Sequence, residues 1–182
     1  MKTDHPWKDV LEEHPREALE FMFPGTAALI DWSEFPRSLE QEMRKLLPAS
    51  ATGDRIVDRL LGCKKGEGEF YVHLEVQGKP EDVFPNRVVE YNDAATLHLR
   101  HPVLSVAILV DDDPDWKPAR YAYEESGFRK TVEWPVFKAL DWLGRFDELE
   151  RHRNPFAFFL LCHLRAQATE GKDEEREAEG KH

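Results

Sequence analysis

The chain has 182 residues, of which 41% are hydrophobic and 34% charged, as in globular proteins with one sizeable core. No apolar run approaches the roughly 20 residues of a membrane span, and the first residues lack the apolar segment of a signal peptide, so no membrane is expected. The formal net charge is −11, whereas DNA-binding proteins usually carry a basic footprint, which counts against a tight nucleic-acid complex.

Cysteine usage predicts a reducing compartment. Cys63 and Cys162 lie in apolar runs and form no C-x-x-C motif, so they are expected to be reduced core residues of a cytoplasmic protein. The histidines show no spacing typical of zinc sites, and each is expected to be structural or exposed: His73, His98, His101 and His163.

The first third of the chain has the apolar spacing of helices. This spacing predicts one helix around residues 7–11 and a second over residues 15–21. The pair Pro24-Gly25 breaks the pattern. An amphipathic helix is then predicted over residues 39–47, and it ends before Pro48.

Two strands flank a turn in the middle of the chain. Residues 56–63 are an apolar run, and residues 70–77 alternate apolar with polar, the period of a half-buried strand. The intervening K-K-G-E-G-E predicts a hairpin turn over residues 65–68. That turn would pair Lys64 with Glu69, Leu60 with His73, and Asp58 with Glu75.

The predicted register would oppose two carboxylates, Asp58 and Glu75. Directly opposed residues have Cβ atoms roughly 4.5–5.5 Å apart, and like charges there are destabilising, so the pair needs a shared proton or a cation. A divalent metal suits it, because Mg²⁺ is usually held by one or two carboxylates plus water. Alternatively, Asp58 only begins a strand and Glu75 is a solvated charge; a one-residue change of register would separate the two.

A helix is predicted after this hairpin. Pro80 ends the strand because it lacks a donor for the ladder. Residues 85–99 have helical spacing, and Arg87 and Tyr91, four residues apart, share a face of that helix.

A buried strand and a second hairpin come next. The apolar run 103–110 predicts a strand buried on both faces, in the centre of a mixed sheet. The acids at 111–113 precede Pro114 and are expected in a solvated turn rather than at a metal. Alternation about Ser126-Gly127 predicts a hairpin outside the main sheet, and residues 136–143 are ambiguous between strand and helix.

The chain is predicted to end in a helix and a tail. Asn154-Pro155 is a good helix start, with Asn as N-cap and Pro at the first position. The helix over residues 156–168 is apolar nearly all round, so it is expected to pack on the sheet or on a second subunit. Residues 170–182, with six acids and three bases, are expected to be a disordered tail.

Seven stretches carry a resemblance to a known family: P-W-K-D-V-L at 6–11, F-M-F-P at 21–24, I-D-W at 30–32, H-L-E-V-Q-G at 73–78, R-V-V-E-Y-N at 87–92, L-S-V-A-I-L at 104–109 and N-P-F-A at 154–157. They resemble the Rpn-like recombination-promoting nucleases, a bacterial cytosolic family also labelled transposases. Asp58, a hairpin and then Glu75-Val76-Gln77 look like the core of the wider PD-(D/E)XK nuclease superfamily, with Gln in place of the usual Lys.

The resemblance implies an α/β (α+β) fold. The expected core is restriction-endonuclease-like, with a mixed central β-sheet flanked by helices and preceded by an N-terminal helical segment. Residues 1–169 would form this single domain, and residues 170–182 the acidic tail.

The resemblance also implies a metal-dependent DNA endonuclease. Asp58, Glu75 and the backbone carbonyl of Val76 would hold Mg²⁺ or Mn²⁺. Glu42, on the helix predicted over residues 39–47, would approach the same metal, although a solvated helix face is the alternative for it.

The position of Gln77 is where the chain departs from the superfamily, whose Lys orients the attacking water and stabilises negative charge. Gln77 orients water through its amide but brings no charge. Arg87 or Lys79 would then supply the positive charge. In the resembling family an Arg and a Tyr at the places of Arg87 and Tyr91 sit near the site. The alternative for Arg87 is a salt bridge with Glu90 or Asp93.

Three functions remain open on the sequence. The first is the nuclease. The second is a catalytically weak or inactive protein of the same fold that acts as a binding module, which the acidic composition favours. The third, an unrelated α/β binding domain, requires that Asp58 and Glu75 do not meet. The apolar helix over residues 156–168 also predicts a possible homodimer.

Overall fold

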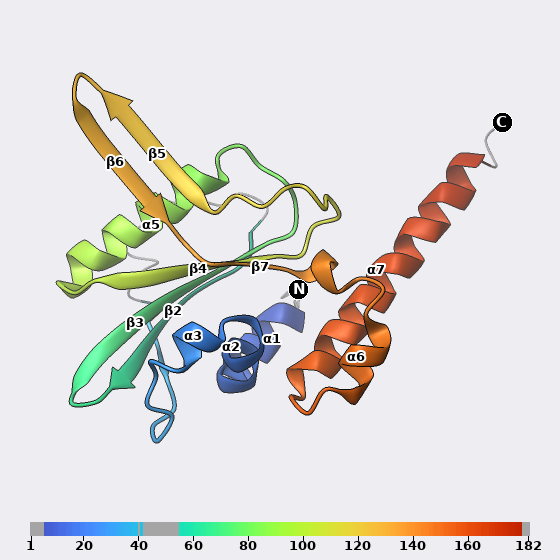
Figure 1. Cartoon of the computed structure of the whole chain (residues 1–182), viewed down its shortest axis with the longest axis horizontal. Coiled ribbons are helices and arrows are strands. Elements are labelled where there is room, and N and C mark those ends of the chain that lie inside the picture. Colours follow the sequence, from blue (N-terminus) through green and yellow to red (C-terminus); the bar gives the residue numbers. More distant parts are fainter. Residues whose placement is uncertain (1–5, 40, 42–54, 180–182) are drawn as a thin grey trace.

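A five-stranded mixed sheet forms the centre of the computed structural model, which describes residues 6–39, 41 and 55–179 (Figure 1). Side chains are described for these residues except 55–58 and 170–179. The strand order is β1-β2-β3-β4-β7. The strands are β1 (Arg37–Ser38), β2 (Arg55–Lys65), β3 (Gly68–Gln77), β4 (Val103–Leu109) and β7 (Val136–Lys138). The predicted mixed α/β fold is confirmed.

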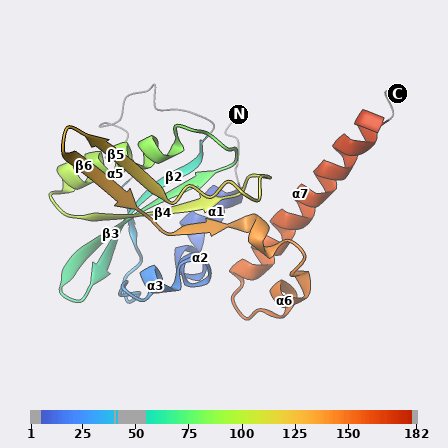
Figure 2. The same ribbon diagram turned by 45° about the horizontal axis from the view of Figure 1, so that its top comes forward.

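Helices cover both faces of this sheet (Figures 1 and 2). The helix α5 (Phe84–Leu99) lies on one face. The other face carries the N-terminal and C-terminal helices: α1 (Pro6–Glu13), α2 (Pro15–Met22), α3 (Pro24–Ala27), α6 (Phe146–Arg151) and the first turns of α7 (Phe156–Glu179). The predicted N-terminal helices are therefore present, and Pro24 starts a short helix where a break was predicted.

The β2–β3 hairpin has the predicted register. Lys64 is paired with Glu69, Leu60 with His73 and Asp58 with Glu75. The turn closes on Gly66, whose φ of 59° is a left-handed conformation that glycine adopts without strain. A register irregularity between Arg55 and Val57 lies beyond these pairs, so it does not change them.

The strand β3 is buried on both faces, although its alternating pattern predicts a half-buried strand. Phe70, Val72, Leu74 and Val76 face the N-terminal and C-terminal helices, and the last three are at most 1% exposed. The alternate residues face α5 and are buried too. The alternation therefore marks a buried polar face and not a solvent-exposed one.

The helix α5 is the crossover between two parallel strands, β3 and β4. Parallel neighbours need such a connection, since a two-residue turn joins only antiparallel ones. The strand β4 lies between β3 and β7, parallel to both, so it is central and buried as predicted. The polypeptide leaves α5 through Arg100, which has a φ of 54°.

The second predicted hairpin is a separate two-stranded sheet, β5 (Arg120–Glu125) with β6 (Phe128–Glu133), which projects from the body (Figure 1). Residues 136–143, which were ambiguous between strand and helix, contain one element of each kind. The strand β7 comes first, and a 3₁₀ helix, η2 (Ala139–Trp142), follows it. Pairing with β4 decides the first half, because a three-residue strand has little preference of its own.

The helix α7 begins as predicted and extends further. Asn154 caps it, because its Oδ1 accepts a hydrogen bond from the backbone N–H of Phe156 at 2.9 Å. A disordered tail was predicted from Glu170, whereas the helix continues to Glu179 and points away from the body (Figure 1). The sequence there is rich in Glu, Lys, Arg and Ala, all strong helix formers.

Two predictions fall outside the described residues. The amphipathic helix over 39–47 lies there except for residues 39 and 41, and so does Glu42. Among the helices that the structure describes, none combines the length and the apolar content needed to cross a membrane.

Candidate functional site

A row of three polar side chains lies under α5, on the face of β3 opposite its apolar residues. His73, Glu75 and Gln77 alternate along the strand, and each is 0% exposed. They interrupt the apolar packing beneath α5, which is divided into two clusters: Leu39, Leu60, Tyr71, Tyr91 and Ala95; and Phe84, Val88, Val89, Ala107, Leu109 and Trp134. Burying a charge is costly unless it is paired, so this row needs partners.

Arg87 on α5 is the main partner. Its Nε donates to Glu75 Oε1 at 2.8 Å and its Nη2 to Gln77 Oε1 at 2.5 Å. Its Nη1 donates to Glu81 Oε2 at 2.6 Å. A guanidinium has five N–H donors in a planar fork, so one side chain can serve three acceptors. Gln77 is held at its other end too, because its Nε2 donates to the Lys79 carbonyl at 2.8 Å.

The charge of Arg87 is secured by this environment. Burial by itself lowers the pKa of Arg87, but the attraction of Glu75 and the hydrogen bonds with Glu81 and Glu75 outweigh it and raise the pKa above its usual value. Arg87 therefore brings a permanent positive charge to the polar row.

This geometry decides between the alternatives for the cation. Arg87 pairs with Glu75 and Glu81, not with Glu90 or Asp93 as the alternative had it. The Lys79 side chain is exposed, and the Lys79 carbonyl accepts a hydrogen bond from Gln77 Nε2. Arg87 is a predicted cation that donates directly to Gln77 Oε1.

The structure describes the side chains of only some of the predicted metal ligands. Asp58 is directly opposite Glu75 in the backbone register, but its side chain lies outside the described part of the structure, as does all of Glu42. The Val76 side chain packs on the other face of the sheet, in the core with the N-terminal helices. Of the predicted site residues, Glu75, Gln77 and Arg87 are the ones whose side chains the structure describes in contact with one another.

His73 belongs to this row, although the sequence analysis treated it as an ordinary histidine. Its Nε2 faces Glu75 Oε2 at 3.4 Å, and its ring stacks on Tyr91 with centroids 3.9 Å apart. The signal was present in the pattern, because a residue two positions before Glu75 shares its face of the strand. Tyr91 therefore lies beside the row.

Ser105 and Asn92 extend the polar contacts beyond His73. Ser105 Oγ lies 3.0 Å from His73 Nδ1, and Asn92 Nδ2 donates to Ser105 Oγ at 2.9 Å. Both residues were missed. A serine inside the apolar run 103–110 was the available signal, since a buried hydroxyl needs a partner.

A second buried ion pair lies at the carboxyl ends of β4 and β7. Lys138 Nζ is 2.5 Å from Asp111 Oδ1, and both side chains are at most 1% exposed. Asp111 was predicted in a solvated turn, which is wrong for this acid: the parallel pairing of β4 with β7 brings Lys138 to it.

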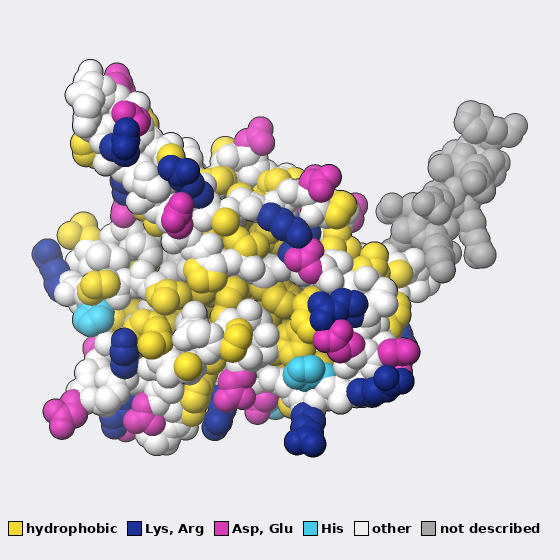
Figure 3. Space-filling view, viewed as in Figure 1, with side chains coloured by type: hydrophobic (Ala, Val, Ile, Leu, Met, Phe, Trp, Pro, Cys, Tyr) yellow, Lys and Arg dark blue, Asp and Glu magenta, His cyan; other side chains and the backbone are white. Residues whose placement is uncertain are grey.

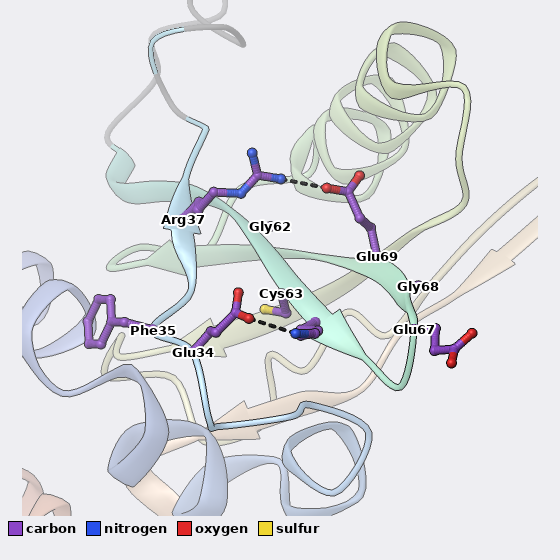
Figure 4. A pocket seen from close by; sticks show the side chains of 9 residues that line it. Glu34, Phe35, Arg37, Gly62, Cys63, Glu67, Gly68 and Glu69 are labelled. Atoms are coloured by element: carbon purple, nitrogen blue, oxygen red, sulfur yellow. Dashed lines mark hydrogen bonds and ion pairs between the residues drawn. The ribbon is translucent and has the colours of Figure 1, made fainter.

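The hollow of about 300 Å³ in Figure 4 lies elsewhere, beside β1 and the β2–β3 turn. Four of its five charged side chains form two ion pairs: Lys64 contacts Glu34 at 2.6 Å and Arg37 contacts Glu69 at 2.7 Å. Cys63 lines it as well, but burial raises the pKa of that thiol to about 11, which disfavours the nucleophilic thiolate.

The polar row suits a hard cation in its chemistry. Glu75, Gln77 and Glu81 present oxygen atoms, the ligands that Mg²⁺ prefers, and the register adds a second carboxylate residue, Asp58, opposite Glu75. Among the described side chains, no three His, Cys, Asp or Glu residues gather in a metal-binding group. A metal site here therefore depends on Asp58.

Charges of both signs are mixed on the face shown in Figure 3. Lys and Arg side chains stand beside Asp and Glu, and a hydrophobic band crosses the middle of this face. A continuous basic stripe, the usual footprint of a DNA-binding surface, is not seen on it.

Comparison with known proteins finds no match for this chain among protein-family models, curated proteins or solved structures.

Proposed function

We propose that this chain is a metal-dependent endodeoxyribonuclease whose metal ligands are Asp58 and Glu75. The observation that carries the proposal is the register of the β2–β3 hairpin, which sets Asp58 directly opposite Glu75. Glu75 itself is fully buried, and a buried carboxylate is costly in a protein core even when an arginine is paired with it. Binding of a divalent cation would account for the two carboxylate residues. The resemblance of H-L-E-V-Q-G and its neighbouring motifs to a nuclease family also supports this proposal.

Glu75, Gln77 and Arg87 would have different roles in the proposed hydrolysis. A bound Mg²⁺ would supply Lewis acidity and an activated water for hydrolysis of the phosphodiester. Glu75 is held for ligation by Arg87, which fixes its Oε1. Gln77 presents a neutral amide to orient water, and Arg87 supplies the positive charge that a lysine at this position would bring.

The substrate would approach at the carboxyl end of β3. His73, Glu75 and Gln77 are fully buried, but the chain comes to the surface directly after them, where Lys79 is exposed and the side chain of Glu81 is 23% exposed. Because the surface is acidic overall, we expect weak binding of DNA that depends on the metal rather than on a basic groove.

A second candidate is a binding module that keeps this fold without catalysis. The observation that favours it is the engagement of Arg87, which already satisfies acceptors on Glu75, Gln77 and Glu81 with a protein cation. In that case the guanidinium serves in place of a metal, and the row is a structural network.

Nicking of supercoiled plasmid separates the two candidates. We expect the parent protein to nick with Mg²⁺ or Mn²⁺ and not with EDTA. Asp58→Asn and Glu75→Gln keep the shape of each side chain but remove a carboxylate, and each should lower the nicking rate by about 100-fold or more, because metal catalysis supplies several kcal/mol. Asp112→Asn, at an exposed acid outside the row, is the matched control and should nick like the parent.

Metal binding measured by calorimetry completes the test. A parent protein that neither binds Mn²⁺ nor nicks DNA would leave the binding module as the function. Nicking that survives Asp58→Asn unchanged would show that the activity comes from another site or from a contaminant.

A further inference from the structure

His73 is held on three sides within the buried row. Its ring is 0% exposed and lies parallel to Tyr91, with an interplanar angle of 8°. One ring nitrogen, Nδ1, is 3.0 Å from Ser105 Oγ. The other, Nε2, is 3.4 Å from Glu75 Oε2, a contact longer than an ordinary hydrogen bond.

The hydrogen bonds around Ser105 favour one tautomer of His73. Asn92 Nδ2 donates both to the Val103 carbonyl at 2.7 Å and to Ser105 Oγ at 2.9 Å, so the Ser105 oxygen accepts there. The hydroxyl proton of Ser105 is available for its other contact, His73 Nδ1. With Nδ1 as acceptor, the neutral ring carries its proton on Nε2, which faces Glu75.

A purely structural ring would not need this arrangement. An aromatic hydrocarbon would stack on Tyr91 equally well, and it would avoid burying two ring nitrogens and a serine hydroxyl. What the imidazole adds is a polar ring nitrogen 3.4 Å from Glu75 Oε2, while Arg87 Nε donates to Oε1. Each oxygen of one carboxylate thus has a nitrogen-bearing neighbour.

We propose that His73 is a positioning residue for the metal ligand Glu75: its Nε2–H orients the carboxylate, and Ser105 and Asn92 set its tautomer. This inference rests on the proposed nuclease function, because it takes Glu75 to be a ligand. Each carboxylate oxygen has two lone pairs, so the contacts with His73 and Arg87 leave lone pairs for a metal. Groups that hold ligands in this way are worth about 10- to 100-fold in metal affinity.

Two amide replacements at residue 73 provide the test. Gln carries its amide at the distance of Nε2 and can still donate to Glu75, whereas the shorter Asn reaches only as far as Nδ1. We expect His73→Asn to weaken Mn²⁺ binding about 10- to 100-fold by calorimetry, with a similar fall in nicking rate at limiting Mn²⁺. His73→Gln should stay within about threefold of the parent, below the 10- to 100-fold loss expected of His73→Asn. His73→Phe, which keeps the stacking on Tyr91 alone, should match His73→Asn.

Thermal melting and circular dichroism on each variant control for folding, and the Gln–Asn comparison still decides if the Phe variant fails to fold. Equal Mn²⁺ affinity in His73→Gln and His73→Asn would overturn the positioning role, whether both fall or neither does, and would leave the nuclease proposal standing. A parent protein whose Mn²⁺ binding is absent, or is unchanged by Asp58→Asn, would overturn the metal site itself and this inference with it.

Discussion

Under the proposed nuclease function, Arg87 would explain how Gln77 can take the place of the lysine that is usual in the nuclease superfamily. A lysine at residue 77 would bring its ammonium to the place where Gln77 Oε1 now accepts from Arg87 Nη2 at 2.5 Å. Two buried cations in contact are unfavourable, whereas an amide oxygen is an acceptor for the guanidinium. Arg87 on α5 thus supplies the positive charge, and the neutral Gln77 on β3 accepts a hydrogen bond from it.

Gln77→Lys is therefore expected to be harmful on its own. The added charge would lie buried beside Arg87, and an uncompensated buried charge costs about 3–5 kcal/mol of unfolding free energy. Urea unfolding should show that loss, and nicking should fall with it. The double variant Gln77→Lys/Arg87→Gln moves the charge to β3 and should recover most of the stability.

The matched control is Glu90→Lys, an exposed site on the same helix, which should change the unfolding free energy by no more than about 0.5 kcal/mol. A stable and active Gln77→Lys single variant would show that Arg87 can leave the row, contrary to this account.

At the scale of elements, the carboxyl ends of the parallel strands hold both buried ion pairs. Gln77 ends β3, Lys138 ends β7, and Asp111 follows β4. Aromatic rings lie between the two cations: Phe84 is 5.4 Å from the Arg87 guanidinium, Trp116 is 5.7 Å from Lys138 Nζ, and the two rings are 5.3 Å apart. The edge of the sheet is therefore closed by one continuous set of charged and aromatic contacts.

Removing Lys138 should cost more than removing the whole pair. Lys138→Met leaves the Asp111 carboxylate buried without its cation, which is expected to lower the unfolding free energy by about 3–5 kcal/mol. Lys138→Met/Asp111→Leu removes both charges and should recover most of that loss in urea unfolding. A double variant as unstable as Lys138→Met would mean that Lys138 acts through its hydrogen bond to the Trp116 carbonyl, at 3.1 Å, instead.

Sequence reasoning succeeded where the information is local. The register of the β2–β3 hairpin follows from a symmetric turn and a period-two pattern, and the central strand β4 follows from a continuous apolar run. The cap at Asn154 is local as well. These features depend on neighbours in the chain, which a single sequence displays.

The partners of the buried charges could not be predicted in the same way. Asp111 meets Lys138 only because β4 and β7 are parallel neighbours, and nothing in the sequence marks that pairing. Arg87 had local candidates in Glu90 and Asp93, but α5 turns its face to β3, so the more distant Glu75 is the partner. His73 was discounted because its pattern was compared with zinc sites and not with the face it shares with Glu75.

At the scale of the whole molecule, α7 hides most of its apolar surface within its own chain. Phe156, Leu160 and Leu164 are at most 2% exposed, so the helix does not present apolar residues all round. The apolar surface that α7 exposes is a narrow strip: Phe158 is 67% exposed, and Cys162, one turn further on, is exposed too.

We still expect a homodimer, and this strip is the contact that it would use. Phe158→Glu should abolish the dimer, because a buried carboxylate without a partner is costly at an interface, while the fold is kept. Light scattering at micromolar concentration is the measurement. Phe35→Glu, at an equally exposed residue before β1, is the control and should leave the mass unchanged. A parent protein with the monomer mass would contradict the expectation.

The order in which the polar row is assembled has a consequence for folding kinetics. Asp58, His73 and Glu75 lie on one hairpin, whose contacts are close in sequence and can form early, whereas Arg87 and Ser105 arrive only when α5 and β4 dock. Until then the charge on Glu75 remains in water, so its burial belongs to the late part of the folding reaction. Substitutions in the hairpin turn should therefore slow folding, while loss of Arg87 or Ser105 should mainly speed unfolding. If the proposed nuclease function holds, the metal site would be complete only in chains that have finished folding.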